Sequence, residues 1–94
     1  MMLTTTYRIN GRVQGVGFRF TTMMVAKQLH LTGTVKNESD GSVTIVLNAD
    51  ASKRDEFITA LKEETRRGFA QMSTIDILSE EEQSPFDDFR VVYR

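Results

Sequence analysis

The chain of 94 residues contains no cysteine, a single proline and a single histidine. The absence of cysteine excludes disulfide bonds, thiolate catalysis and cysteine-ligated metals within this sequence. The lone His30 disfavours both a histidine metal centre and a Ser-His-Asp triad. No apolar run approaches the length of a transmembrane helix, and the first residues lack the basic start and apolar middle of a signal peptide. We therefore expect a cytoplasmic protein.

Acidic residues are also absent from residues 1–37, although the whole chain has a net charge of −1. This first portion carries five basic residues, whereas residues 38–94 carry all thirteen acidic residues and seven basic ones. Such a distribution favours a small anionic ligand near the first portion and argues against a long nucleic acid bound across the surface. Chance segregation of charge in a short chain is the alternative explanation.

The remaining composition is that of an ordinary globular protein. Hydrophobic residues make up 39% of the chain and charged residues 27%, which indicates neither disorder nor a membrane-embedded chain. A chain of this length builds one hydrophobic core. We predict a single domain over residues 1–94.

The hydrophobic pattern of the first half predicts a strand, a helix and a hairpin. Apolar and polar residues alternate over residues 4–13, which is the period of a strand with one buried face. Over residues 18–30 the apolar residues recur every three or four positions, as on one face of a helix. Two short strands, 31–36 and 43–47, flank a turn at residues 39–41 and form the hairpin.

A second helix follows the hairpin. Ser52 and Asp55 fit the serine-x-x-acid pattern that caps a helix, and the apolar face continues to about Arg67. We expect the helix to end at Gly68, because glycine commonly follows the last helical residue.

Two further strands are predicted over residues 74–78 and 89–93, separated by an acidic loop at residues 79–88. In that loop the carboxylates are interpreted as a solvated charge run rather than a metal site. The resulting order is β-α-β-β-α-β with a short extra C-terminal strand. This is the pattern of a ferredoxin-like α+β sandwich, in which two helices cover one face of an antiparallel sheet. Many unrelated functions share this order, so it does not identify the chemistry.

Three glycines and an arginine gather where the first strand runs into the first helix, in the segment GRVQGVGFR (Gly11–Arg19). Gly15 and Gly17 leave backbone N–H groups accessible and φ unrestricted, and the positive end of the helix dipole lies beside them. The segment Gln14–Arg19 therefore suits a tetrahedral dianion, although it matches neither a P-loop nor a dinucleotide fingerprint. A glycine-rich turn without a ligand is the alternative. Arg19 favours the ligand, because a cation beside the positive helix end is unfavourable unless an anion is present.

Asn37 is a second candidate, at the end of the strand that precedes the turn. An asparagine at this position commonly bonds its own backbone in a turn. Its amide could equally position a water molecule, because it offers a donor and an acceptor without a charge.

Two segments of the chain together resemble the two-part signature of the acylphosphatase family. These are IxGxVQGVGFR at Ile9–Arg19 and GTVKNESDGSV at Gly33–Val43. The first matches at every position expected to be fixed. In the second, an aromatic residue usually stands at the position of Thr34, and a glycine commonly stands at the positions of Ala49 and His30. We expect these departures to affect packing and stability more than chemistry.

The resemblance implies a small, metal-free enzyme without a cofactor that hydrolyses acyl phosphates to a carboxylate and inorganic phosphate. It further implies that the arginine at position 19 and the loop amides bind the phosphoryl group, that Asn37 holds the attacking water, and that the substrate's own phosphate accepts the water proton. A monomer without a nucleic-acid or membrane partner is expected. The residues expected to bind substrate are Gln14, Gly15, Val16, Gly17, Phe18 and Arg19.

Three other hypotheses remain open at this stage. A non-catalytic anion-binding or regulatory domain would keep the loop without turnover. A ferredoxin-like RNA-binding module would need a basic and aromatic stacking surface, which the predicted strands lack. A third possibility is the acylphosphatase-like end of a larger carbamoyl-transferring maturation protein, but the length of the chain favours a free-standing domain.

Overall fold

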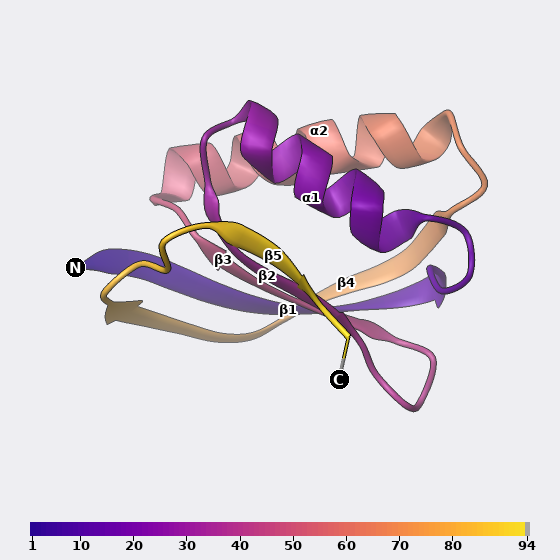
Figure 1. Cartoon of the computed structure of the whole chain (residues 1–94), viewed down its shortest axis with the longest axis horizontal. Coiled ribbons are helices and arrows are strands. Elements are labelled where there is room, and N and C mark those ends of the chain that lie inside the picture. The colour runs from indigo at the N-terminus through magenta and orange to yellow at the C-terminus, as the bar shows by residue number, and fades with distance from the viewer. Residues whose placement is uncertain (94) are drawn as a thin grey trace.

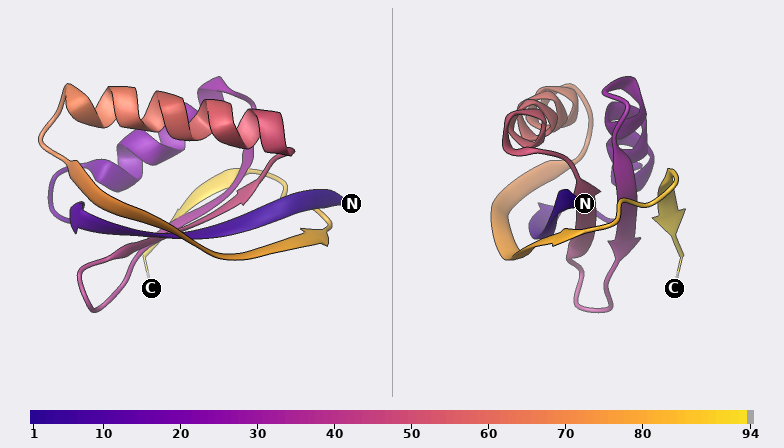
Figure 2. Two further views of the ribbon diagram at one scale, coloured as in Figure 1. Left: turned by 180° about the vertical axis from the view of Figure 1, so that it is seen from behind. Right: turned by 90° about the vertical axis from the view of Figure 1, so that its left-hand side faces the viewer.

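Two helices lie side by side on one face of a five-stranded sheet (Figure 1), and the end-on view in Figure 2 separates the helical layer from the sheet. The computed structural model describes residues 1–93 of the chain. Along the chain the elements are β1 (Met2–Arg12), α1 (Phe18–Gln28), β2 (Thr32–Asn37), β3 (Val43–Asn48), α2 (Ala51–Arg66), β4 (Gln71–Gln83) and β5 (Phe89–Val92). The predicted ferredoxin-like order with a short extra strand is confirmed.

The strands are arranged in the order β4-β1-β3-β2-β5. All neighbouring strands are antiparallel except β2 and β5, which run parallel and make the sheet mixed rather than wholly antiparallel. Because β1 and β2 are both antiparallel to β3, they point in the same direction, and β5 follows them. The C-terminal ends of β1, β2 and β5 therefore lie at one end of the sheet. This end carries the loop that leads into α1.

The hydrophobic core lies between the sheet and the helices. Alternate residues of the strands point into it, as the period of a half-buried strand requires; Tyr7 and Ile9 on β1 are examples. Each buried large apolar side chain contributes about 1.5–3 kcal/mol relative to an exposed one. The fully buried apolar residues are Tyr7, Ile9, Val13, Phe18, Val25, Ala26, Val35, Val43, Ile45, Leu47, Ala49, Phe57, Leu61 and Phe89.

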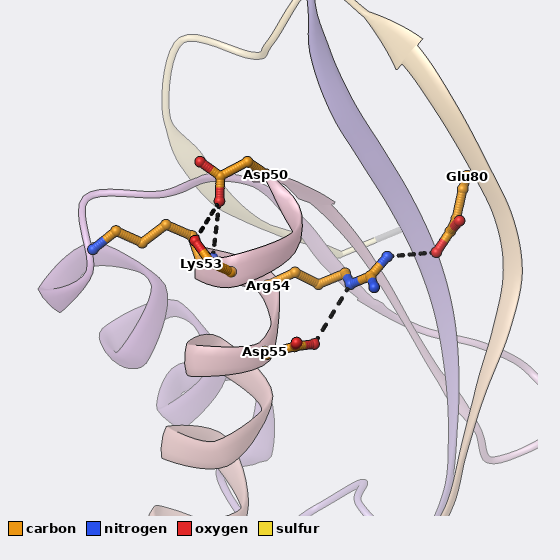
Figure 3. Close-up of polar contacts among 6 residues, drawn as sticks. Asp50, Lys53, Arg54, Asp55 and Glu80 are labelled. Atoms are coloured by element: carbon orange, nitrogen blue, oxygen red, sulfur yellow. Dashed lines mark hydrogen bonds and ion pairs between the residues drawn. The ribbon is translucent and has the colours of Figure 1, made fainter.

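β4 is much longer than the strand predicted over residues 74–78, and the predicted acidic loop at 79–88 is correct only in its last part. Residues 79–83 continue β4 and pair with the first residues of β1, from Thr6 back to Met2. A register shift between Thr6 and Tyr7 allows the longer pairing. The glutamates are tolerated in the strand for two reasons. Hydrogen bonds to β1 pair the backbone N–H and C=O groups of this part of β4, and the glutamate side chains remain exposed to solvent at the edge of the sheet. Figure 3 shows Arg54 of α2 paired with Glu80 of β4.

The N-terminus of α2 differs from the predicted cap. The helix begins two residues before the expected position, and Asp50 rather than Ser52 is the N-cap (Figure 3). The Asp50 carboxylate accepts hydrogen bonds from the Lys53 N–H and the Ser52 hydroxyl, each at 3.0 Å. Asp and Ser are both favoured N-caps, so the sequence pattern alone does not choose between them. The hydrogen bond from the Lys53 N–H, followed by the one from the Ser52 hydroxyl, holds the pKa of Asp50 below its usual value.

α1 ends at Gln28, two residues before the predicted end. His30 adopts the left-handed conformation, with φ of 60°. The N–H groups of His30 and Leu31 donate to the carbonyls of Lys27 and Ala26 at 3.1 and 2.9 Å. These are the two hydrogen bonds of a Schellman motif, with histidine at the position that glycine usually occupies.

Asn48 forms a buried polar junction that the sequence analysis did not identify. Its Nδ2 donates to Thr4 Oγ1 at 2.7 Å, while its Oδ1 accepts from the Thr32 hydroxyl at 2.8 Å and from the Phe86 N–H at 2.9 Å. The side chain is 1% exposed. It therefore joins β1, β3 and β2 to the segment that leads into β5.

Neither helix formed by residues 1–93 is long and apolar enough to cross a membrane.

Candidate active site

An open cleft of about 530 Å³ lies where β1, β2 and β5 end, beside the start of α1. It brings Arg19 and Asn37, which are separated by a helix and a strand in the sequence, into one cavity. The lining residues come from the β1–α1 loop, the first turns of α1 and the ends of two strands. They are Val13, Gly15, Gly17, Phe18, Arg19, Phe20, Met23, Asn37, Phe89, Arg90, Val91 and Tyr93.

The β1–α1 loop presents free backbone donors to the cleft. Gly15 and Gly17 have φ of 75° and 78°, the left-handed region that residues with a Cβ rarely adopt. A Cβ added to either glycine would have no other atom within 4 Å, so the conformation and the open approach, rather than tight packing, require glycine here. Among residues 1–93, no acceptor receives a hydrogen bond from the N–H groups of residues 15–19. These groups stand at the positive end of α1, where an anion is stabilised.

Nothing in the first turn of α1 competes with a bound anion. Gly17 is the N-cap and supplies no side-chain cap, and the turn contains no acidic residue. Arg19 has no carboxylate partner within ion-pair distance among the described residues. Its guanidinium instead lies over the Tyr93 ring, with Cζ 4.9 Å from the ring centroid. The positive charge of Arg19 and the helix end therefore reinforce each other.

Asn37 supplies a buried acceptor to the same cleft. It is the last residue of β2, and by strand alternation it faces the same side as Val35, which is fully buried. Thr34 lies on the opposite face by the same alternation, so the missing aromatic side chain at that position does not change the wall that carries Asn37. The Oδ1 atom is buried and accepts no hydrogen bond from any described residue. A buried amide oxygen without a partner is unfavourable, and a water molecule at this position would satisfy it.

Gln14 connects the loop to the β2–β3 turn instead of lining the cleft. Its Nε2 donates to two backbone carbonyls, Glu38 O and Ser42 O, each at 2.8 Å. Glu38 directly follows Asn37. The side chain that the sequence analysis grouped with the substrate-binding residues therefore holds the two halves of the site together.

Val16 and Phe18 turn their side chains toward the core. Phe18 is fully buried, and Val16 is half-buried against the same core cluster. Any contact of these two residues with an anion is made through their backbone N–H groups.

The cleft also contains residues that the sequence analysis did not assign to it. Phe20, Met23, Arg90 and Tyr93 line it. Phe20 and Tyr93 are apolar rings that are 58% and 76% exposed. Their positions could not be recognised from spacing, because α1 and β5 are brought together only by the parallel pairing of β5 with β2.

The acidic residues lie mainly away from this cleft. Glu80–Glu82 pair with Leu3–Thr5 at the start of β1, about 25–30 Å by strand rise from the loop after Arg12. At the β2–β3 turn, Asp40 accepts hydrogen bonds from the hydroxyl and N–H of Ser42, which hold its pKa below the usual value. Within residues 1–93, no group of three or more histidine, aspartate or glutamate side chains could hold a metal ion.

Comparison with known proteins places this site in a family context. The Acylphosphatase family model matches residues 5–91. An acylphosphatase from Lactobacillus johnsonii is 44% identical over 92 residues, covering 98% of this chain and 100% of the relative. The crystal structure of acylphosphatase from Bacillus subtilis matches with a TM-score of 0.85 and 34% identity, over 98% of this chain and 100% of that one. HypF from T. kodakarensis matches with a TM-score of 0.79 and 29% identity over 99% of this chain, but over only 12% of its own length.

Proposed function

The chain belongs to the acylphosphatase family and is a hydrolase of acyl phosphates, and we propose that Arg19, Asn37 and the backbone N–H groups of residues 15–19 carry out this hydrolysis. One observation carries the proposal. The N–H groups of the loop, the Arg19 guanidinium and the buried Oδ1 of Asn37 share a single cleft, and none of them has a hydrogen-bond or ion-pair partner among residues 1–93.

Binding begins with the phosphoryl group in the β1–α1 loop. Its equatorial oxygens accept hydrogen bonds from the loop N–H groups and from the forked guanidinium of Arg19. In phosphoryl transfer, charge spreads over these same oxygens, so donors fixed in advance by the backbone lower the barrier. The face of the Tyr93 ring limits the orientations available to the Arg19 guanidinium.

Asn37 orients the nucleophile. Its Oδ1 accepts a hydrogen bond from a water molecule, and the lone pair of that water then faces phosphorus opposite the leaving carboxylate. The new bond forms between the water oxygen and phosphorus while the bond from phosphorus to the carboxylate oxygen breaks. The water proton passes to a phosphoryl oxygen, and the products are a carboxylate and inorganic phosphate. No protein side chain is needed as a general base, because a phosphoryl oxygen accepts the water proton, and none is needed as a general acid, because the leaving carboxylate is already stable.

We also propose the remaining properties expected from the sequence: a single domain over residues 1–94, a monomer, a cytoplasmic location, no cofactor, and no nucleic-acid or membrane partner. One continuous core that includes residues from β1 through β5 supports the single domain. The other properties stay predictions.

The proposed roles are tested by the hydrolysis of acetyl phosphate by chelator-treated protein. We expect the wild type to turn over and Arg19→Ala and Asn37→Ala each to lose on the order of a hundredfold or more in kcat, by analogy with the removal of one oxyanion donor. Arg8→Ala and Asn10→Ala are the matched controls, because they remove the same side-chain types from β1 outside the cleft, and both should keep wild-type turnover. Normal turnover in Arg19→Ala or Asn37→Ala would contradict the role given to that residue. Phosphate binding without any turnover by the wild type would instead indicate a non-catalytic anion-binding domain.

A further inference from the structure

We propose that the outer part of the cleft is an acyl-binding subsite that favours acyl phosphates with an apolar, flat acyl group. This inference rests on the proposed function, because it concerns the part of the substrate that the phosphate loop does not bind. The subsite is defined by Phe20, Met23 and Tyr93, which line the cleft around Arg19.

The first wall of the subsite comes from α1. The buried face of this helix is formed by Phe18, Thr22, Val25 and Ala26, and Phe20 lies off that face. Its ring is 58% exposed although it lines the cleft. Met23 is one turn further along, so the two side chains are neighbours on the helix surface. An exposed phenylalanine beside a flexible thioether is a surface that an apolar ligand can cover.

The second wall is formed by Tyr93, the residue that follows β5. Tyr93 is 76% exposed, and its ring lies against the Arg19 guanidinium. Because Arg19 is proposed to bind the phosphoryl oxygens, its neighbours Phe20 and Tyr93 must lie close to the leaving carboxylate. The acyl group therefore leaves the phosphate loop between two exposed rings that belong to different elements.

The charges of the cleft favour an apolar acyl group over an anionic one. Among residues 1–93, the only other cation that lines it is Arg90, which could bind a second anionic group. On β5, however, Phe89 faces the core and Val91 shares that side, so strand alternation directs Arg90 toward the opposite face. Arg90 also lines a neighbouring cavity together with Asp87 and Asp88. The side chains directed at the acyl position are thus the apolar ones.

The experiment compares kcat/KM for benzoyl phosphate and acetyl phosphate in the wild type and in Phe20→Ala. Both substrates use the same phosphate loop. For each enzyme we take the ratio of kcat/KM for benzoyl phosphate to kcat/KM for acetyl phosphate and compare this ratio between wild type and variant. The intrinsic chemical reactivity of the two substrates then cancels. We expect Phe20→Ala to lower kcat/KM for benzoyl phosphate on the order of tenfold, mainly through KM, and to change that for acetyl phosphate less than about twofold. Phe20→Tyr, which keeps the ring, should retain the wild-type ratio. Phe69→Ala is the matched control, because Phe69 is 80% exposed but lies outside the cleft.

Three other results would overturn the subsite. An unchanged ratio in Phe20→Ala means that the ring does not contact the acyl group. An equal loss with both substrates assigns Phe20 to the general integrity of the site. A wild-type preference for succinyl phosphate that Arg90→Gln abolishes means that the cleft recognises an anionic acyl group instead. Failure of the wild type to hydrolyse acetyl phosphate would refute the proposed function itself, whereas the three results above leave it intact.

Discussion

Gln14 is the residue on which the alignment of the two halves of the site depends. Its amide bonds to the carbonyls of Glu38 and Ser42, so it fixes the distance between the phosphate loop and the end of β2. A displacement of about 1 Å between a bound phosphoryl group and its nucleophile can lower the rate a hundredfold. A residue that touches neither reactant can therefore strongly affect turnover.

We predict that Gln14→Ala lowers kcat by on the order of ten- to a hundredfold. The affinity for inorganic phosphate should fall much less, since the loop N–H groups and Arg19 remain. The loss of two part-buried hydrogen bonds should also lower the free energy of unfolding by about 1–3 kcal/mol. Steady-state kinetics, phosphate inhibition and urea denaturation measure the three effects separately. An unchanged kcat in a variant that is destabilised as expected would show that Gln14 acts on folding alone.

His30 adopts a conformation that glycine adopts without strain. A left-handed φ costs a residue with a Cβ about 1–2 kcal/mol, and the His30 side chain is exposed and makes no hydrogen bond to any described residue. His30→Gly should therefore raise the free energy of unfolding by about 1 kcal/mol and the Tm by roughly 4–8 °C for a domain of this size. His30→Ala keeps the strain and should give no such increase. Equal stability of the glycine and alanine variants, measured by thermal denaturation, would contradict this explanation.

At the level of elements, the segment between β4 and β5 is held to the sheet by the buried amide of Asn48 and by a hydrogen bond from the Gly33 N–H to the Asp88 carbonyl at 3.0 Å. Asn48 accepts from Phe86 N–H and Thr32, and it donates to Thr4. This junction holds the chain as it crosses from the β4 edge of the sheet to the β5 edge, passing the end of the sheet at which β3 ends and β2 begins. β5 in turn forms one wall of the cleft.

Asn48→Ala should lower the free energy of unfolding by about 2–4 kcal/mol, because it leaves several buried polar groups without partners. Asn10→Ala is the matched control: Asn10 makes one exposed hydrogen bond to Thr74, and its loss should change stability by no more than about 0.5 kcal/mol. Urea denaturation provides the comparison. A similar small effect in both variants would mean that the junction is not a major support of the fold.

The order of the elements could be predicted from local patterns, but some of their boundaries could not: Asp50 rather than Ser52 caps α2, and the length of β4 depends on pairing. The alternation that ends in Tyr7 and Ile9 and the glycines before α1 are local signals, so β1 and the loop could be recognised. The length of β4 depends on β1, because only pairing with Met2–Thr6 makes a strand of the glutamate run at 80–82. The hydrogen bonds of Gln14 could not be predicted either, because their acceptors are backbone carbonyls, which every residue has.

At the level of the whole molecule, the loop N–H groups and Arg19 lie at one end of the sheet, whereas the glutamates of β4 pair with the start of β1 at the other end. Asn37 and Arg19 could be proposed as a pair from the family resemblance, but their common cleft depends on the parallel direction of β1 and β2. The apolar walls of the cleft could not be predicted, because Phe20 and Tyr93 are about seventy positions apart and carry no motif.

Inorganic phosphate should stabilise the protein against thermal unfolding by binding only to the folded loop. At a concentration one hundred times its Kd, the gain is about 2.7 kcal/mol, which for a domain of this size corresponds to an increase in Tm on the order of 10 °C. Arg19→Ala should lose most of this increase at the same phosphate concentration. Sodium chloride at matched ionic strength is the control and should have little effect on either protein. An equal increase in the wild type and in Arg19→Ala would contradict specific binding at the loop.

The position of β5 has a consequence for biosynthesis. The core sheet of β1, β3, β2 and β4, with both helices, consists of residues that leave the ribosome before Phe89, whereas one wall of the cleft is formed by residues 89–93. The cleft is therefore incomplete in any nascent chain from which Phe89 has not yet emerged, and the hydrophobic core, to which Phe89 also belongs, is incomplete as well.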